Sequence, residues 1–293
     1  MRSSNPVFSR RGFSRDNGYA GFNAQQPQAG GPAAGTNPYA TNPYATNPYA
    51  TQDAQRGAPA QAPARPGAMT IDDVVSRTAM TLGTVFVTAA LAWFLMPVDP
   101  ANLGRSYGIA IGAALVAFVF AMIQAFKRKA SPALILLYAA FEGVFLGVIS
   151  NAVSTYVSPG VVPQAVLGTM AVFAGVLIAY KMRWIRVTRR FYGFVMAAAM
   201  GFILLMAVNL LFSVFGGGDG LGFRSGGLGI LFGVIGIVIG ACFLALDFKQ
   251  VEDGIAYGAP REESWLAAFG LTMTLVWIYL EFLRLISILQ GDD

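Results

Sequence analysis

The stretch LGILFGVIGIVIGACFLAL, residues 228–246, decides the fold class of this chain. It contains no charged side chain, and its length falls within the range of about 17 to 25 residues that crosses a bilayer as a helix. The seven apolar segments of this kind are 78–96, 107–126, 133–157, 164–180, 191–215, 228–246 and 265–289. Because 55% of the residues are hydrophobic and only 12% are charged, the composition excludes an ordinary soluble domain. We therefore expect an all-α, polytopic membrane protein, a bundle of seven transmembrane helices.

The basic residues lie mainly in short loops between the apolar segments. The net charge of +5 could suggest nucleic-acid binding. However, loop lysines and arginines set membrane orientation, so we expect no nucleic-acid partner. On one side lie Arg65, Arg77, Lys127, Arg128, Lys129, Lys181, Arg183, Arg186, Arg189, Arg190, Lys249 and Arg261, and on the other only Arg105 and Arg224. The asymmetry predicts a cytoplasmic N-terminus and, after an odd number of spans, an external C-terminus.

Two domains are predicted: a tail, residues 1–68, and a transmembrane domain, residues 69–293. The tail is rich in Gly, Pro, Ala, Gln and Asn and lacks hydrophobic periodicity, which predicts disorder. The pentapeptide TNPYA occurs three times in tandem at residues 36–50. It is interpreted as part of a flexible tether, with a tyrosine-bearing docking array as the alternative. Thr70 and Asp73 resemble a capping box, so a helix should lead from Thr70 into the first span.

Several chemistries are excluded by composition. The chain has no histidine, which removes imidazole-ligated zinc sites and Ser-His hydrolase dyads. Its single cysteine, Cys242, can form no internal disulfide. All lysines lie at or beyond the ends of spans, which argues against a buried retinal Schiff base. No nucleophile-base pair is evident, so we expect neither an enzyme nor a cofactor.

Glycines spaced four apart occur in the third and sixth spans. Gly143 and Gly147 lie in the third span, and the sixth contains the pairs Gly229/Gly233 and Gly236/Gly240. Such glycines share one helix face and allow a neighbouring backbone to approach closely. Both helices are therefore expected in the middle of the bundle, although glycine is also common in membrane helices generally.

Three carboxylates, Glu142, Asp247 and Glu281, lie inside or at the end of predicted spans. An ionised acid in hydrocarbon costs roughly 2.5 to 3.5 kcal/mol, so these residues are candidate functional groups. Helical rise places Glu142 about 14 Å into its span and Glu281 about 24 Å along the last one, with Asp247 near the cytoplasmic boundary. Counting along the helices thus favours pairing Glu142 with Glu281.

Two structural alternatives accompany this interpretation. Asp247 can be a solvated helix end, and Glu281 can form a local ion pair with its candidate counter-charge Arg284, three residues later on the same helix face. If two of the acids meet, they cannot easily ionise together and would share a proton, as a pH-dependent gate requires. Calcium needs six to eight oxygen ligands, so two or three carboxylates predict only a weak or transient calcium site.

The acids lie in three short motifs: FEGVFLG at residues 141–147, Leu246 with Asp247, and IYLEF at residues 278–282. Through these motifs the chain resembles the transmembrane Bax inhibitor motif family of small seven-span proteins. The resemblance covers about residues 70–290. It implies a pH-sensitive calcium leak channel. It also implies a pH-sensing, hydrogen-bonded pair of Asp247 with Glu281, the candidate calcium ligands, and a gating role for Glu142. The family usually has Asp where this chain has Glu281.

Two functions are therefore expected from these features. The first is a proton-regulated cation leak, carrying calcium, with Glu142, Asp247 and Glu281 as pH-sensing groups along the ion pathway. The second is a membrane interaction protein that transports nothing and modulates a protease or another membrane complex. The expected partners are the lipid bilayer, calcium or protons, and other membrane proteins.

Overall fold

The computed structural model describes residues 67–96, 98, 103–127, 129–216, 221–223 and 225–291. Within these ranges, seven helices are long and apolar enough to cross a membrane. They are α2 (Ile71–Leu95), α3 (Leu103–Phe126), α4 (Pro132–Tyr156), α5 (Val161–Lys181), α6 (Arg189–Gly216), α7 (Gly226–Ala256) and α8 (Ser264–Gly291). The all-helical fold and the seven predicted spans are confirmed. The predicted tail lies outside the described residues, except for positions 67 and 68.

Helix α2 begins where the sequence places a cap. The Thr70 hydroxyl accepts a hydrogen bond from the backbone N–H of Asp73 at 3.2 Å, and the Asp73 carboxylate accepts one from the N–H of Thr70 at 3.3 Å. This reciprocal pair satisfies two of the N–H groups that a helix start leaves open. The predicted helix leading from Thr70 into the first span is therefore confirmed.

Helix α7 extends well past the predicted end of its span. The apolar run stops at Leu246, but the helix continues to Ala256. The added turns are polar, and Lys249 lies 2.8 Å from Asp253 and 3.6 Å from Glu252, at spacings that stabilise a helix. Hydropathy therefore located the end of the apolar stretch and missed the end of the helix.

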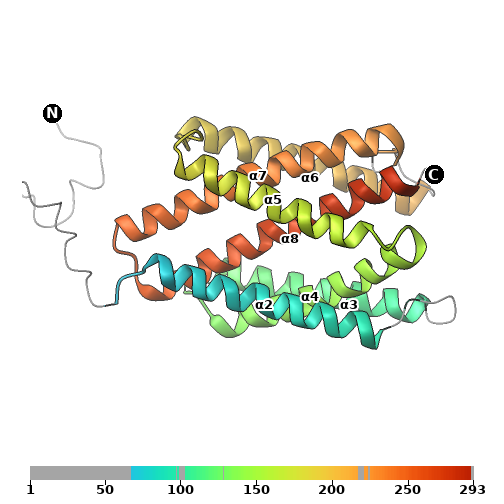
Figure 1. The fold of residues 1–293 in the computed structure, drawn as a ribbon, viewed down its shortest axis with the longest axis horizontal. Coiled ribbons are helices and arrows are strands. Elements are labelled where there is room, and N and C mark those ends of the chain that lie inside the picture. Colours follow the sequence, from blue (N-terminus) through green and yellow to red (C-terminus); the bar gives the residue numbers. More distant parts are fainter. Residues whose placement is uncertain are drawn as a thin grey trace, which may run out of the picture. The chain divides into compact units, whose positions relative to one another are not determined.

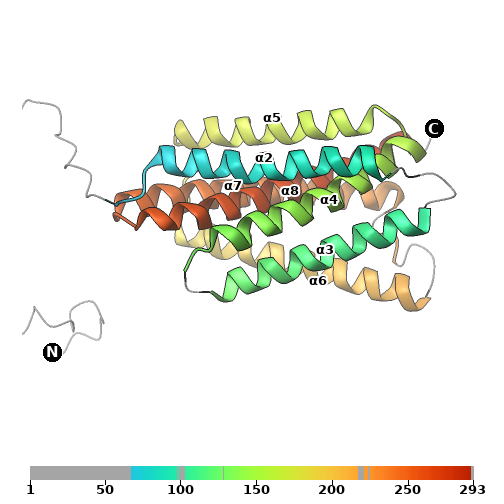
Figure 2. The same cartoon turned by 90° about the horizontal axis from the view of Figure 1, so that it is seen from below.

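Helix α8, the last in the chain, occupies the centre of the helical unit. It contacts α2, α4, α5 and α7. Figure 1 shows it running between α7 and α5 on one side and α2 and α4 on the other. In the perpendicular view, α5 lies on one face and α3 and α6 on the opposite face (Figure 2). Helices α4 and α7, which carry the glycine pairs, flank this central helix.

The glycine positions coincide with close helix contacts. A Cβ added at Gly143 would collide with the Val85 carbonyl and Thr88 of α2, and one at Gly147 would lie 2.8 Å from the Ala92 methyl. On α7, a Cβ at Gly240 would lie 2.5 Å from Ile278 of α8. Close approach through small residues is therefore what joins α4 to α2 and α7 to α8.

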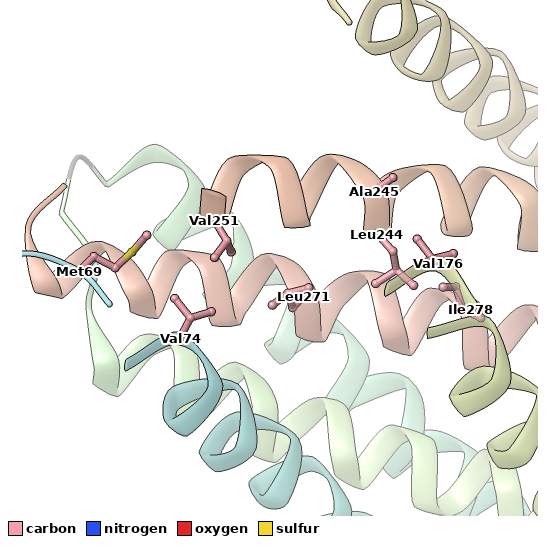
Figure 3. Packing of buried hydrophobic residues seen from close by; sticks show 8 residues of the cluster. All are labelled: Met69, Val74, Val176, Leu244, Ala245, Val251, Leu271 and Ile278. Carbon is pink, nitrogen blue, oxygen red and sulfur yellow. The ribbon is translucent and has the colours of Figure 1, made fainter. Parts of the chain in front are cut away.

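The largest apolar cluster follows the α7–α8 contact. Its buried members are Met69, Val74, Val176, Leu244, Ala245, Val251, Leu271 and Ile278. Figure 3 shows that these side chains come from α7 and α8, from the start of α2 and from α5. The cluster therefore holds together elements from both ends of the described chain.

The segment before α2 is tied to the turn between α7 and α8. The N–H of Met69 donates to the Ala259 carbonyl at 2.8 Å, and the N–H of Arg261 donates to the Gly67 carbonyl at 2.8 Å. The Arg261 side chain also lies 2.6 Å from the Asp73 carboxylate. This short antiparallel bridge fixes the start of the first span to the last helical hairpin.

Candidate functional site

Asp247 lies within the α7–α8 contact, and the helix does not end there. It is half-buried, and its carboxylate accepts a hydrogen bond of 2.7 Å from the Thr274 hydroxyl of α8. Gly270 of α8 also lies beside the carboxylate, since a Cβ there would be in van der Waals contact with Asp247 Oδ1 at 3.4 Å. Nine residues of helix follow Asp247, a rise of about 14 Å. The alternative of a solvated helix end is therefore wrong.

Glu281 occupies a second position on the same contact. Its side chain is buried, with 7% of the residue exposed, and it packs against a glycine of α7. A Cβ at Gly236 would lie 2.8 Å from Glu281 Cδ. The carboxylate therefore occupies the notch that the glycine leaves. Because α7 is shaped to accept it, the α7–α8 register is fixed at this point.

Arg284 forms an ion pair with Glu281 from the next turn of α8. Arg284 Nη2 donates to Glu281 Oε2, and both side chains are about nine-tenths buried, at 12% and 10% exposed. Arg284 Nε and Nη1 are buried without a hydrogen-bond partner among the described residues. The charge of Glu281 is thus compensated within its own helix.

Glu142 lies on the other side of α8. It is half-buried on α4, and among the described residues no hydrogen-bond or ion-pair partner is found for it. Tyr138, one turn before it, packs edge-on against Phe269 with ring centroids 5.1 Å apart. Further along, Ser150 and Tyr279 share a hydrogen bond of 2.6 Å. These two contacts set the register of α4 against α8 and place Glu142 near the level of Thr272 to Thr274.

Neither predicted pairing of the acids is formed. Gly236, which receives Glu281, and Asp247 are separated by eleven residues of α7, a rise of about 16 Å. The Tyr138–Phe269 and Ser150–Tyr279 contacts place Glu142 opposite about Thr272, nine residues or about 14 Å along α8 from Glu281. Depth counting failed because it assumed where each helix enters the membrane. The resemblance pairs Asp247 with an acid, whereas here a threonine hydroxyl faces it.

The structure instead places Asp247 and Glu142 at one level, on two sides of α8. At this level of α8, the hydroxyls of Thr272 and of Thr81 on α2 share a hydrogen bond of 2.8 Å. Among the described residues, no three Asp, Glu, His or Cys side chains gather as a metal site would require. Asp247 and Glu281, the candidate calcium ligands, do not share a site in this conformation.

Thr274 is the site residue that sequence reasoning missed. It precedes Glu281 by seven residues, which is about two helical turns, so both lie on the same face of α8. The sequence signal for Thr274 was its position on the same helix face as the buried acid. This signal is weak, because threonine is neutral and common in membrane helices.

Comparison with known protein families supports the resemblance seen in the sequence. The family model described as Bax inhibitor 1 like matches residues 5–291. This match confirms the resemblance found in the sequence and extends it, because the tail before residue 70 is also included. No curated protein matches the chain.

Proposed function

We propose, because the chain belongs to the Bax inhibitor 1 like family, that it is a slow, proton-regulated cation leak channel that carries calcium. Seven apolar helices make it an integral, multi-pass membrane protein. The observation that carries the proposal is Asp247, an acid whose hydrogen-bond partner within an apolar helix contact is a neutral hydroxyl. No step of the proposal requires enzymatic chemistry or a bound cofactor.

Asp247 is assigned the role of proton sensor. An ionised carboxylate within hydrocarbon costs roughly 2.5 to 3.5 kcal/mol, and a hydroxyl compensates it less than a cation does. Binding of a proton removes the negative charge of Asp247, and with it the free-energy cost of burying that charge in the α7–α8 contact. A change in pH therefore alters the relative stability of two arrangements of this contact, which is what a gate needs.

The other two acids receive different roles. Glu142 is at the same level of α8 and is assigned to the ion pathway, where its carboxylate offers oxygen to a passing cation. Glu281 is paired with Arg284 and holds α7 and α8 in register. A passing calcium ion would complete its ligand set with water and backbone carbonyls, as weak and transient binding requires.

The proposed orientation has the N-terminus in the cytoplasm and the C-terminus outside. It rests on the excess of Lys and Arg in loops on the N-terminal side. In this orientation the proton sensor lies nearer the cytoplasmic ends of α7 and α8, and Glu281 lies nearer the outside. The gate would then respond first to cytoplasmic pH.

The test is calcium flux into proteoliposomes over a pH series. We expect Asp247→Asn to flatten the pH dependence of flux and Glu142→Gln to lower flux several-fold. The Glu281→Gln protein that folds should keep the wild-type pH dependence of flux. Glu262→Gln is the control, since Glu262 is an exposed acid in the α7–α8 turn. Wild-type protein without flux, or flux indifferent to both Asp247→Asn and Glu142→Gln, would refute the proposal.

A second candidate function is a non-transporting membrane interaction protein that modulates a protease or another membrane complex. The observation that favours it is the tail, whose three TNPYA repeats lie within the family match. The same flux assay separates the two functions. Wild-type protein that is folded but passes no calcium at any pH would favour the interaction protein, and deletion of residues 1–66 would then abolish its effect on the partner.

A further inference from the structure

We propose that the lateral groove between α2 and α5 binds an acyl chain of a membrane phospholipid. The groove has a volume of about 750 Å³ and is lined by residues of α2, α4, α5 and α8. Its walls are α2 and α5, and its floor is formed by α4 and α8. It is separate from the acids, none of which lines it, so the inference does not depend on ion transport.

The groove exists because its two walls are held by different neighbours. Gly143 and Gly147 let α2 approach α4 until backbone and side-chain atoms touch. On the other side, Gly168 of α5 makes room for the Phe282 ring of α8, to which a Cβ would come within 2.8 Å. Since α2 is fixed on α4 and α5 is fixed on α8, the two walls cannot close on each other. Figure 1 shows α2 and α5 on opposite sides of α8.

The dimensions suit an extended chain. The α2 wall runs from Thr78 to Phe94, seventeen residues whose sixteen helical steps span about 24 Å. The hydrocarbon core of a bilayer is about 30 Å thick, so the groove follows most of its depth. A compact ligand would leave most of this length empty, whereas an acyl chain lies along it.

The lining is chemically matched to hydrocarbon. Ser150 and Tyr279 on the floor satisfy each other by a hydrogen bond, and the Thr169 hydroxyl donates to the Ala165 carbonyl at 2.8 Å. These groups have no need of a polar ligand. The rim includes Phe86 and Phe94, whose rings are largely exposed on the outer surface of a membrane-spanning helix. In a bilayer this surface faces lipid, so lipid chains are the molecules at the entrance of the groove.

The groove holds its occupant by apolar contact. Thr78 lines one end of the groove and Phe94 the other, and Thr78 Oγ1 is buried and presents no surface to a ligand. The polar tail of this chain is unsuited to the groove, because its backbone groups would be left unsatisfied in hydrocarbon.

Lipid retention tests the proposal directly. The full chain is reconstituted in dioleoylphosphatidylcholine liposomes, extracted in mild detergent and examined by native mass spectrometry. We expect one retained phospholipid per chain. The double variant Ala90→Phe with Ala174→Phe fills the groove from both walls and should reduce retention at least tenfold. Ala197→Phe, at an exposed position of α6, is the matched control and should retain the lipid.

Equal retention in wild type and the filled variant would refute the site. Dimers in wild type that the filled variant loses would identify a second copy of the chain as the occupant and also refute the proposal.

A fluorescence measurement covers the case in which the filled variant does not fold. Trp93 lines the groove. Its emission, taken as the difference between wild type and Trp93→Phe, should be quenched by lipid with dibrominated acyl chains. Quenching should persist after dilution into detergent with unbrominated lipid, because a groove-bound chain exchanges more slowly than surrounding lipid. Immediate recovery of the emission would show that Trp93 meets only bulk lipid and would overturn the proposal.

Discussion

Asp247 and Glu281 both lie in the contact between α7 and α8, but their partners differ. Glu281 is paired with the guanidinium of Arg284, whereas Asp247 accepts a hydrogen bond from the hydroxyl of Thr274. A charged partner keeps an acid ionised, and a neutral partner leaves proton binding open. The comparison shows that burial alone does not identify a proton-sensing acid. The partner decides whether the acid holds the helices or responds to pH.

The largest effect on stability is expected when Glu281 loses its cationic partner. Arg284→Met removes the guanidinium that pairs with the buried Glu281 carboxylate, which should lower the free energy of unfolding by on the order of 3 kcal/mol. Denaturant titration in mixed micelles measures the change. The double variant Glu281→Gln with Arg284→Met should recover most of it. If the double variant were as unstable as the single one, packing would explain the loss and the ion pair would not.

The notch that receives Glu281 offers the next largest effect. Gly236→Ala places a methyl group 2.8 Å from Glu281 Cδ, and overpacking of this kind costs about 1 to 3 kcal/mol. Gly201→Ala on α6 is the matched control, because a Cβ there meets nothing within 4 Å. The control should be neutral or slightly stabilising, since alanine favours the helix. Equal losses at both glycines would mean that the notch does not hold Glu281.

A smaller change is expected at the Asp247 site. Thr274→Val removes the hydroxyl donor and should cost about 0.6 kcal/mol, the average for a hydrogen bond between membrane helices. It should also move the midpoint of the pH dependence of flux, while Thr274→Ser keeps both properties. Proteoliposome flux and micelle unfolding report the two effects separately. An unchanged pH profile in Thr274→Val would remove Thr274 from the proposed sensor.

The smallest effect is expected at an ion pair outside the apolar contact. Arg261 and Asp73 lie 2.6 Å apart, but the Arg261 side chain is 65% exposed. Exposed pairs are screened by solvent and contribute little. Arg261→Gln should therefore leave the thermal unfolding midpoint nearly unchanged, in contrast to Arg284→Met. A loss as large as that of Arg284→Met would show that the exposed pair contributes as much to stability as the buried pair.

The sequence predicted the spans well because apolar length is a local property. Each of the seven predicted segments corresponds to a helix, and even the cap at Thr70 is present. The end of α7 was missed because its last turns are polar and are stabilised by pairs such as Lys249 with Asp253. Hydropathy responds to the membrane, whereas helix length also depends on such pairs.

The candidate site was predicted in part. Sequence patterns identified the three acids, and Arg284 as a candidate counter-charge, but they gave no correct contact between acids. Which residues of α7 face which residues of α8 depends on the small-residue notches at Gly236 and Gly240, and thus on register. Register is a property of two helices together. It cannot be obtained by counting residues along either one.

The bridge between residues 67–69 and the α7–α8 turn has a consequence for biosynthesis. Helix α2 is made first and α8 last, yet Met69 is buried in the cluster that α7 and α8 form. On the ribosome, α2, α3 and α4 can associate as soon as they are inserted, because the contacts at Gly143 and Gly147 are already present. The first helix nevertheless gains its final anchor only when the last hairpin arrives. A chain interrupted before α8 therefore lacks the centre of the bundle and should be recognised by the membrane quality-control machinery as unfinished.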